Sequence, residues 1–282
     1  MPSHIDVLVG DYATAVTTNQ KAISADSEFS RREGADNFYT LYRIHNYHFV
    51  VYGAMFAGQK EVALRAARDL VLQVPDDVLR KQANLIDAFI PTPFHVLVRF
   101  GAWEEILKEP APAEYLPMSR AIRHYARAVA YAATGRVDKA EAEQELFQKA
   151  QKEVPETSFL FRNSSIDILE VAESMIRGEI AYRKTEFDEA FKHLREAVRR
   201  DDALNYDEPW GWMQPARHAL GALLLERGEF AESESVYRAD LKRHPKNVWA
   251  LHGLVESLEN QGKQTPQPNI NRYSKPLQNR PT

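Results

Sequence analysis

The sequence predicts an all-α protein, a right-handed α-α superhelix of about six to seven helix pairs. Apolar residues recur at three- and four-residue spacing, which is typical of a helix with one buried face. Turn glycines follow these segments at a repeating distance, and Gly228 and Gly262 lie 34 residues apart. We therefore expect roughly 65 to 75% helix and no sheet of three or more strands.

The clearest helix pair lies between residues 214 and 247. Its small residue Gly221, like Gly178 in an earlier pair, stands seven positions before its turn, where a close helix contact requires a small side chain. Pro245 ends the second helix, because the residue before proline avoids the helical conformation. The other marker positions of this pair are Leu220, Leu224, Gly228, Ser233 and Tyr237.

This spacing resembles the tetratricopeptide repeat, a 34-residue unit with the pattern W-x2-L-G-x2-Y, then A-x3-F, then P. Further units begin near residues 44, 121, 171 and 248. Residues 83–109 form a degenerate unit, and the first repeat is truncated. The stretches at residues 1–5 and 45–49 also resemble bacterial and fungal repeat proteins of unassigned role. The resemblance covers about residues 1–262 and implies a helical superhelix that supplies binding surfaces.

Two segments follow from this pattern, a repeat domain at 1–262 and a tail at 263–282. The tail holds four prolines, four basic residues and no acidic residue, so we expect it to be disordered. Neither end of the repeat domain shows the polar cap that repeat arrays need. We therefore expect a shortened relative of a longer protein or open ends that meet another surface, for instance through self-association.

Composition excludes several functions. The chain has 36 basic and 40 acidic residues, a net charge of −4, which argues against a nucleic-acid or anionic-membrane binder. It has no cysteine, so disulfides, thiolate metal sites and cysteine nucleophiles are excluded. No apolar run approaches the ~20 residues of a membrane span. We expect a cytoplasmic protein.

Common catalytic motifs are also missing from the sequence. It contains no phosphate-binding glycine loop, no G-x-S-x-G and no H-E-x-x-H. We therefore do not favour an enzyme of a common class.

Histidines are the unusual feature, since seven of the nine fall on predicted first helices. His48, His218 and His252 each lie ten residues before a turn glycine, and His4 and His95 lie six before one. Ten and six differ by about one helical turn, so both positions share a face. In repeats of this kind, that face resembles the side that lines the concave groove.

The sequence therefore predicts a scaffold or adaptor that holds a protein or peptide segment in its concave groove. Groove arginines would suit an acidic segment. Trp210 lies on a long connection, where it either contacts a ligand or, as we favour, fills the gap that the connection leaves. The predicted groove residues are His48, His95, His218, His252, Arg43, Arg123, Arg217 and Trp210.

The alternative function is a metal-binding protein or a metal-dependent enzyme. His4, His45, His48 and His95 come from successive units, so their imidazoles could converge on Zn, Cu, Ni or Fe. We favour the simpler interpretation, in which these histidines pack or line the groove, because the spacing alone is weakly specific.

Overall fold

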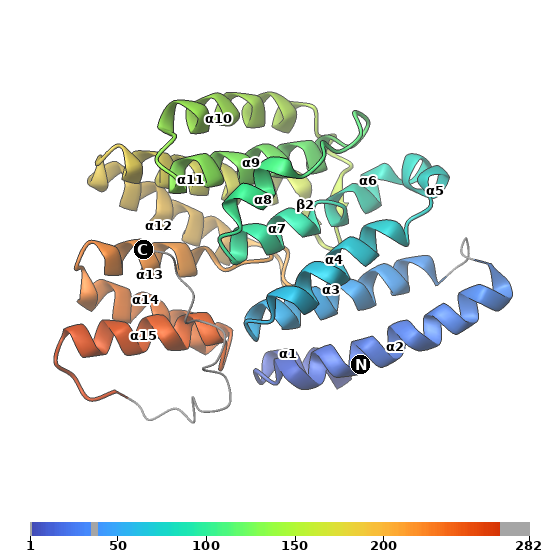
Figure 1. Ribbon diagram of the computed structural model, residues 1–282, viewed down its shortest axis with the longest axis horizontal. Coiled ribbons are helices and arrows are strands. Elements are labelled where there is room, and N and C mark those ends of the chain that lie inside the picture. The colour runs from blue at the N-terminus through green and yellow to red at the C-terminus, as the bar shows by residue number, and fades with distance from the viewer. Residues whose placement is uncertain (1, 35–38, 266–282) are drawn as a thin grey trace.

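The computed structural model describes residues 2–34 and 39–265, and 74% of the structure is helical. It is the all-α repeat array that the sequence predicts (Figure 1). In the described part of the chain, six helix pairs follow one another before a last single helix. The helices are α1 (Pro2–Leu8), α2 (Tyr12–Glu33), α3 (Thr40–Phe56), α4 (Lys60–Leu72), α5 (Asp76–Lys81), α6 (Ala83–Ile86), the 3-10 helix η1 (Asp87–Phe89), α7 (Thr92–Arg99), α8 (Trp103–Lys108), α9 (Pro117–Ala133), α10 (Val137–Lys152), α11 (Ser165–Arg183), α12 (Phe187–Ala203), α13 (Ala216–Glu226), α14 (Phe230–Arg243) and α15 (Val248–Asn260).

Small residues let the paired helices approach closely. A Cβ atom added to Gly221 would lie 2.6 Å from Cζ of Tyr237, and one added to Gly178 would lie 2.6 Å from Cγ of Leu194. Both distances are far below van der Waals contact, so only glycine fits. The predicted close contacts at these two glycines are therefore confirmed.

The turns between paired helices need a left-handed backbone. Gly228 has φ +81° at the turn between α13 and α14. Thr185 occupies the matching turn between α11 and α12 with φ +64°, a conformation that glycine adopts at lower cost.

The degenerate unit at residues 83–109 consists of the short helices α6, η1, α7 and α8. Asp87 in this unit caps the next pair, because its carboxylate accepts hydrogen bonds from the backbone nitrogens of Met118 (2.8 Å) and Ser119 (3.0 Å) at the start of α9. Burial raises the pKa of Asp87 to about 6, although these hydrogen bonds act in the opposite direction.

Longer connections between the units have definite structure. Residues 27–33, which exceed the length of the repeat pattern, continue α2 as far as Glu33 and do not form a loop. Residues 156–165 carry a small antiparallel hairpin, β1 (Phe159–Leu160) and β2 (Asn163–Ser164), in which Phe159 pairs with Ser164. We name residues 204–215, which connect α12 and α13, the inner loop.

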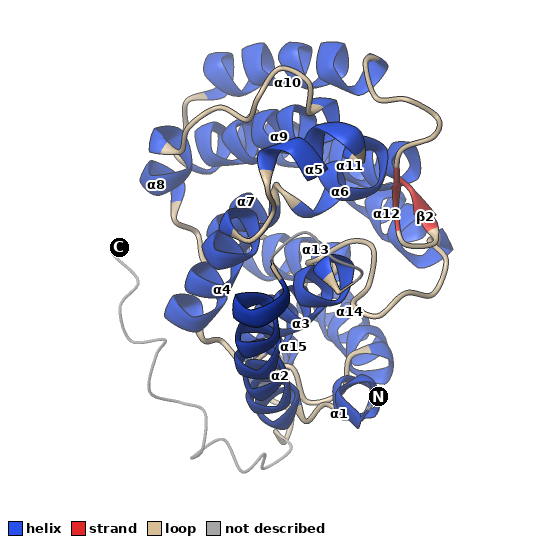
Figure 2. Cartoon of the chain, turned by 90° about the vertical axis from the view of Figure 1, so that its right-hand side faces the viewer, coloured by secondary structure: helices blue, strands red, loops and turns tan. Residues whose placement is uncertain are grey.

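The two ends of the array contact each other. Nε1 of Trp249, on α15, donates a hydrogen bond to the carbonyl oxygen of Met55 on α3 (2.7 Å). Gly10 packs so closely on Pro245 that an added Cβ would lie 2.1 Å from the Pro245 oxygen. Figure 1 shows α15 beside α1 and α2, and Figure 2 shows the same neighbourhood from the side. The surface met by each predicted open end is therefore the other end of the same array.

The expected disordered tail falls largely on residues 266–282, which lie outside the described residues. Among the helices that the structure describes, none is both long and apolar enough to cross a membrane.

Candidate functional site

The N-terminal histidines lie on one side of the array. We name this side, which carries His4, His45, His48 and His95, the inner face. The rings of His4, on α1, and His45, on α3, lie 5.4 Å apart, and both pack on Phe49 at 4.6 and 4.8 Å. Nδ1 of His4 also contacts the carboxylate of Glu208 in the inner loop. Burial and the neighbouring His4 lower the pKa of His45 to about 4, so this imidazole is neutral at pH 7.

His48 and His95 lie deeper in the molecule. Their exposed fractions are 1% and 5%, and the His48 ring meets Phe89 at 5.2 Å. Burial lowers the pKa of His48 to about 3, with His45 and His95 adding to the effect, and burial lowers the pKa of His95 to about 4. Nδ1 of each histidine is buried without a hydrogen-bond partner among the described residues.

Among the described residues, three or more metal ligands do not come together at these histidines. Within residues 2–34 and 39–265, no group of three or more histidine, aspartate or glutamate side chains could hold a metal ion. His4 and His45 face each other, while His48 lies beside Phe89 and His95 beside Trp212. Metal binding by His4, His45, His48 and His95 stays a prediction.

The inner loop covers the inner face. Trp212, which is 1% exposed, packs edge-on against His95 of α7 and against Tyr125 of α9, each at 5.3 Å. Trp210 packs at 5.6 Å on His244, which directly follows α14. These aromatic side chains fill space between helices, as we favoured for the tryptophans of this connection.

The hairpin holds the inner loop in place. Nδ2 of Asn163 donates to the carbonyl oxygen of Asn205 (3.0 Å) and to Asp207 (2.6 Å), and the backbone nitrogen of Asn205 donates to Oδ1 of Asn163 (2.7 Å). Asn163 is 1% exposed. The inner loop therefore occupies part of the inner face, on which the sequence predicts a groove.

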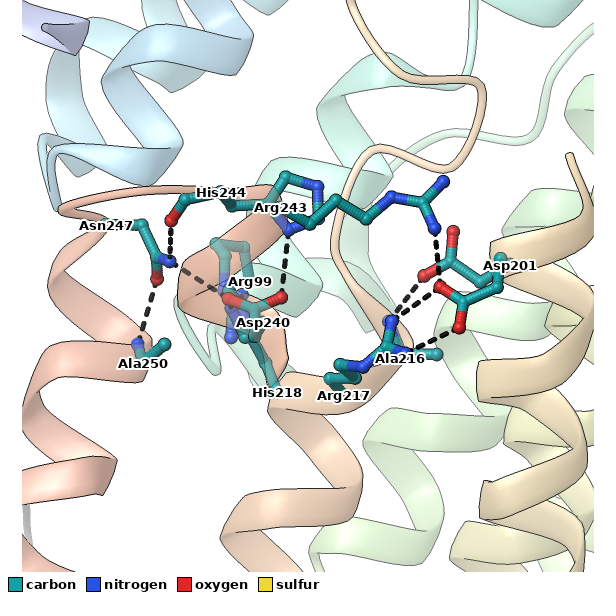
Figure 3. Close-up of polar contacts among 11 residues, drawn as sticks. Arg99, Asp201, Ala216, Arg217, His218, Asp240, Arg243, His244, Asn247 and Ala250 are labelled. Carbon is teal, nitrogen blue, oxygen red and sulfur yellow. Dashed lines mark hydrogen bonds and ion pairs between the residues drawn. The ribbon is translucent and has the colours of Figure 1, made fainter. Parts of the chain in front are cut away.

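Asp240 is the centre of a buried hydrogen-bond network (Figure 3). Its carboxylate lies 2.8 Å from Nε2 of His218, 2.9 Å from Nδ1 of His244 and 2.9 Å from Nδ2 of Asn247. Burial would raise the pKa of Asp240, but the two histidines outweigh it and hold that pKa below its usual range. Figure 3 shows how the network connects α13, α14 and the start of α15.

Arg99 fixes the protonation state of His218. Nη1 of Arg99 lies 2.5 Å from Nδ1 of His218, and a guanidinium can only donate. Nδ1 of His218 must therefore accept, and its Nε2 carries the proton that is donated to Asp240. Burial lowers the pKa of His218, which is consistent with this neutral imidazole.

The remaining predicted groove residues do not form one surface. Arg217 pairs with Asp202 at 2.5 Å, and the guanidinium of Arg43 is buried with Nη2 3.1 Å from Oγ1 of Thr40. Arg123 is partly buried. The side chain of His252 is 56% exposed, so it does not join the buried His48, His95 and His218.

The repeat pattern of the sequence does not reveal the role of Asp240, His244 and Asn247. Asp240 lies in α14, the second helix of its pair, and His244 directly follows that helix. The repeat pattern specifies only packing residues in this helix. Asn247 precedes α15 and accepts a hydrogen bond from the backbone nitrogen of Ala250 (2.8 Å). An asparagine just before an apolar helix is a helix-cap signal, which could have identified this residue.

A surface pocket of about 770 Å³ lies between two consecutive units. Its walls come from the α11–α12 turn, α12, the end of α13, and the first turn of α14. Arg195 and Glu232 cross it with a two-point ion pair at 2.8 Å, and Arg227 lies 3.9 Å from the ring centre of Phe187. The remaining lining residues are Thr185, Glu186, Asp188, Glu189, Phe191, Leu224 and Glu229.

Comparison with known proteins agrees with the repeat architecture. A model of the tetratricopeptide repeat matches residues 122–143, which span α9 and the start of α10, and residues 214–239, which span α13 and most of α14. No curated protein matches the chain. Two stretches of the all-helical array match the tetratricopeptide repeat, which supports a protein of the tetratricopeptide-repeat type.

Proposed function

We propose that this protein is a helical scaffold that binds a segment of a partner protein in the pocket between α12 and α14. Tetratricopeptide repeats suggest such a scaffold role. The inner loop packs on the inner face beside His95, and we therefore favour an outer surface for the partner.

The charge of the pocket carries the proposal. Five carboxylates line it against two guanidinium groups. Asp188 and Glu229 are exposed, and neither makes an ion pair with a described residue. Phe187, Phe191 and Leu224 add apolar surface beside these acids. A segment with basic and apolar side chains matches this combination, because opposite charges orient a partner and apolar contacts hold it.

The proposal predicts binding of a short labelled peptide of lysine and phenylalanine, measured by fluorescence anisotropy. Replacing Asp188 with Lys should weaken binding by about five-fold, since an exposed charge contact contributes up to ~1 kcal/mol. Glu229→Lys should act in the same direction. Added salt should weaken wild-type binding, because exposed charges are screened.

Asp138→Lys is the matched control. Asp138 is the second residue of α10, as Asp188 is of α12, and it is also exposed. Equal loss of binding in the Asp138 and Asp188 variants would refute the pocket as the site. So would equal binding of a peptide of glutamate and phenylalanine.

A further inference from the structure

We propose that the inner face also binds a small carboxylate, at a cluster formed by Arg99, Trp212, Gln214, His48 and His95. These residues lie away from the outer pocket, and the proposal is independent of the scaffold function. It rests on buried polar atoms that lack hydrogen-bond partners among the described residues.

The unpartnered atoms are mainly hydrogen-bond donors. Nε1 of Trp212, Nε of Arg99 and Nε2 of Gln214 are buried without a hydrogen-bond partner among the described residues. The indole and guanidinium nitrogens can only donate. Leaving a buried donor unpaired costs about 1–3 kcal/mol, so native proteins rarely leave several together. A ligand with acceptor oxygens would satisfy them.

These side chains belong to one place in the fold. His95 and Arg99 are four residues apart on α7 and therefore share a face of that helix. Trp212 packs on His95, and Gln214 follows two residues later in the inner loop. His48 is 1% exposed, and His95 contributes to the lowering of its pKa.

Charge favours an anion. Arg99 makes no ion pair with any described carboxylate, and its Nη1 is bound to the neutral His218. Asp240 lies on the far side of that imidazole, 2.8 Å from Nε2. Burial lowers the pKa of Arg99 only to about 10, so the guanidinium stays charged at pH 7. A carboxylate would bring a negative charge to the Arg99 side of the imidazole, and guanidinium groups recognise carboxylates well.

The aromatic neighbours of Trp212 favour a ligand with a flat ring. Trp212 meets His95 and Tyr125 edge-on, at interplanar angles of 90° and 69°. Benzoate is therefore a suitable probe, and benzamide is its neutral counterpart of the same shape.

The test is a titration of the full chain with benzoate, followed by tryptophan fluorescence and thermal unfolding at constant ionic strength. We expect saturable binding of benzoate and a rise in melting temperature that follows mass action. Trp212→Phe retains the ring contacts but removes the N–H, and should weaken binding by about ten-fold, the effect of ~1.4 kcal/mol. Trp210→Phe, in the same loop, should leave binding unchanged.

Equal binding of benzamide and benzoate would overturn the carboxylate assignment. An absence of saturable benzoate binding would overturn the site and leave ordered water as the partner of these donors. If Trp212→Phe does not fold, Gln214→Leu makes the same test by removing another donor. Unchanged affinity in a folded variant that lacks its donor would also refute the proposal.

Discussion

Buried ionisable side chains on the inner face make opposing contributions to stability. Burial lowers the pKa of His48 to about 3 and that of His95 to about 4, so both stay neutral in the folded protein at mildly acidic pH. Burial raises the pKa of Glu179 to about 7 and that of Asp87 to about 6. Acidification therefore stabilises the fold through the two acids and destabilises it through the histidines, and only a variant can isolate one group.

Replacing His48 with Phe should change how stability depends on pH. The pKa of His48 is lower in the folded protein, about 3, than in the unfolded chain, near 6.5. Above pH 6.5 the histidine is neutral in both states and does not oppose folding. As the pH falls from 6.5 toward 3, protonation of the unfolded chain lowers the free energy of unfolding. Between pH 7 and pH 5, wild type should lose about 2 kcal/mol that the variant does not lose. Urea unfolding of both proteins at each pH measures the difference.

The exposed His252 provides the control for this experiment. His252→Phe should keep a nearly constant stability difference from wild type between the two pH values. If His48→Phe behaves in the same way, His48 is not buried as a neutral imidazole.

Helix pairs depend on one small residue at each crossing. Gly221 lies against the ring of Tyr237, and Gly253 of α15 lies against the same ring from the other side, where an added Cβ would be 2.1 Å from Cζ. Tyr237 is thus held between α13 and α15. The Tyr237 side chain therefore limits the side-chain volume that fits at either glycine. It has little room to move, because it is only 4% exposed.

Replacing Gly221 with Leu should overpack this crossing and destabilise the protein by ~1–3 kcal/mol. Ala222 is the adjacent residue on α13 and is exposed, so Ala222→Leu should leave stability nearly unchanged. Thermal or urea unfolding compares the two. Equal stability of both variants would mean that Gly221 does not face the partner helix.

The whole array is closed by contacts between its ends. Trp249 joins α15 to α3 through Met55, and its ring also meets Phe100 at 5.5 Å and the guanidinium of Arg99 at 4.3 Å. Open repeat arrays are stabilised only by neighbouring units. Here the last helix also contacts units far away along the chain, so the ends depend on each other.

Removing the contact of Trp249 with Met55 should also affect the N-terminal helices of the array. Trp249→Ala should lose several kcal/mol of stability and increase hydrogen exchange in α15 and in α3 around Met55. Leu254→Ala alters the same helix at a residue packed in the small core with Tyr237, and its effect should stay within α13–α15. If Trp249→Ala also leaves exchange in α3 unchanged, closure does not stabilise the N-terminal helices.

Local features of the sequence specify the helix pairs of this protein. Helical spacing, turn glycines and the small residues Gly178 and Gly221 predicted the helix pairs, because these features act within about 34 residues of chain. Offsets from the turn glycines predicted one face for His48, His95, His218 and His252, of which the first three are buried and His252 is 56% exposed.

The contacts of the inner face depend on parts of the chain that are far apart in the sequence. Asn163 fixes the inner loop from more than forty residues away, and Trp249 reaches Met55 from 194 residues away. Such long-range contacts leave no periodic signal in the sequence. They place the inner loop against His95 and join the ends of the array, because removing apolar and aromatic surface from water stabilises the fold.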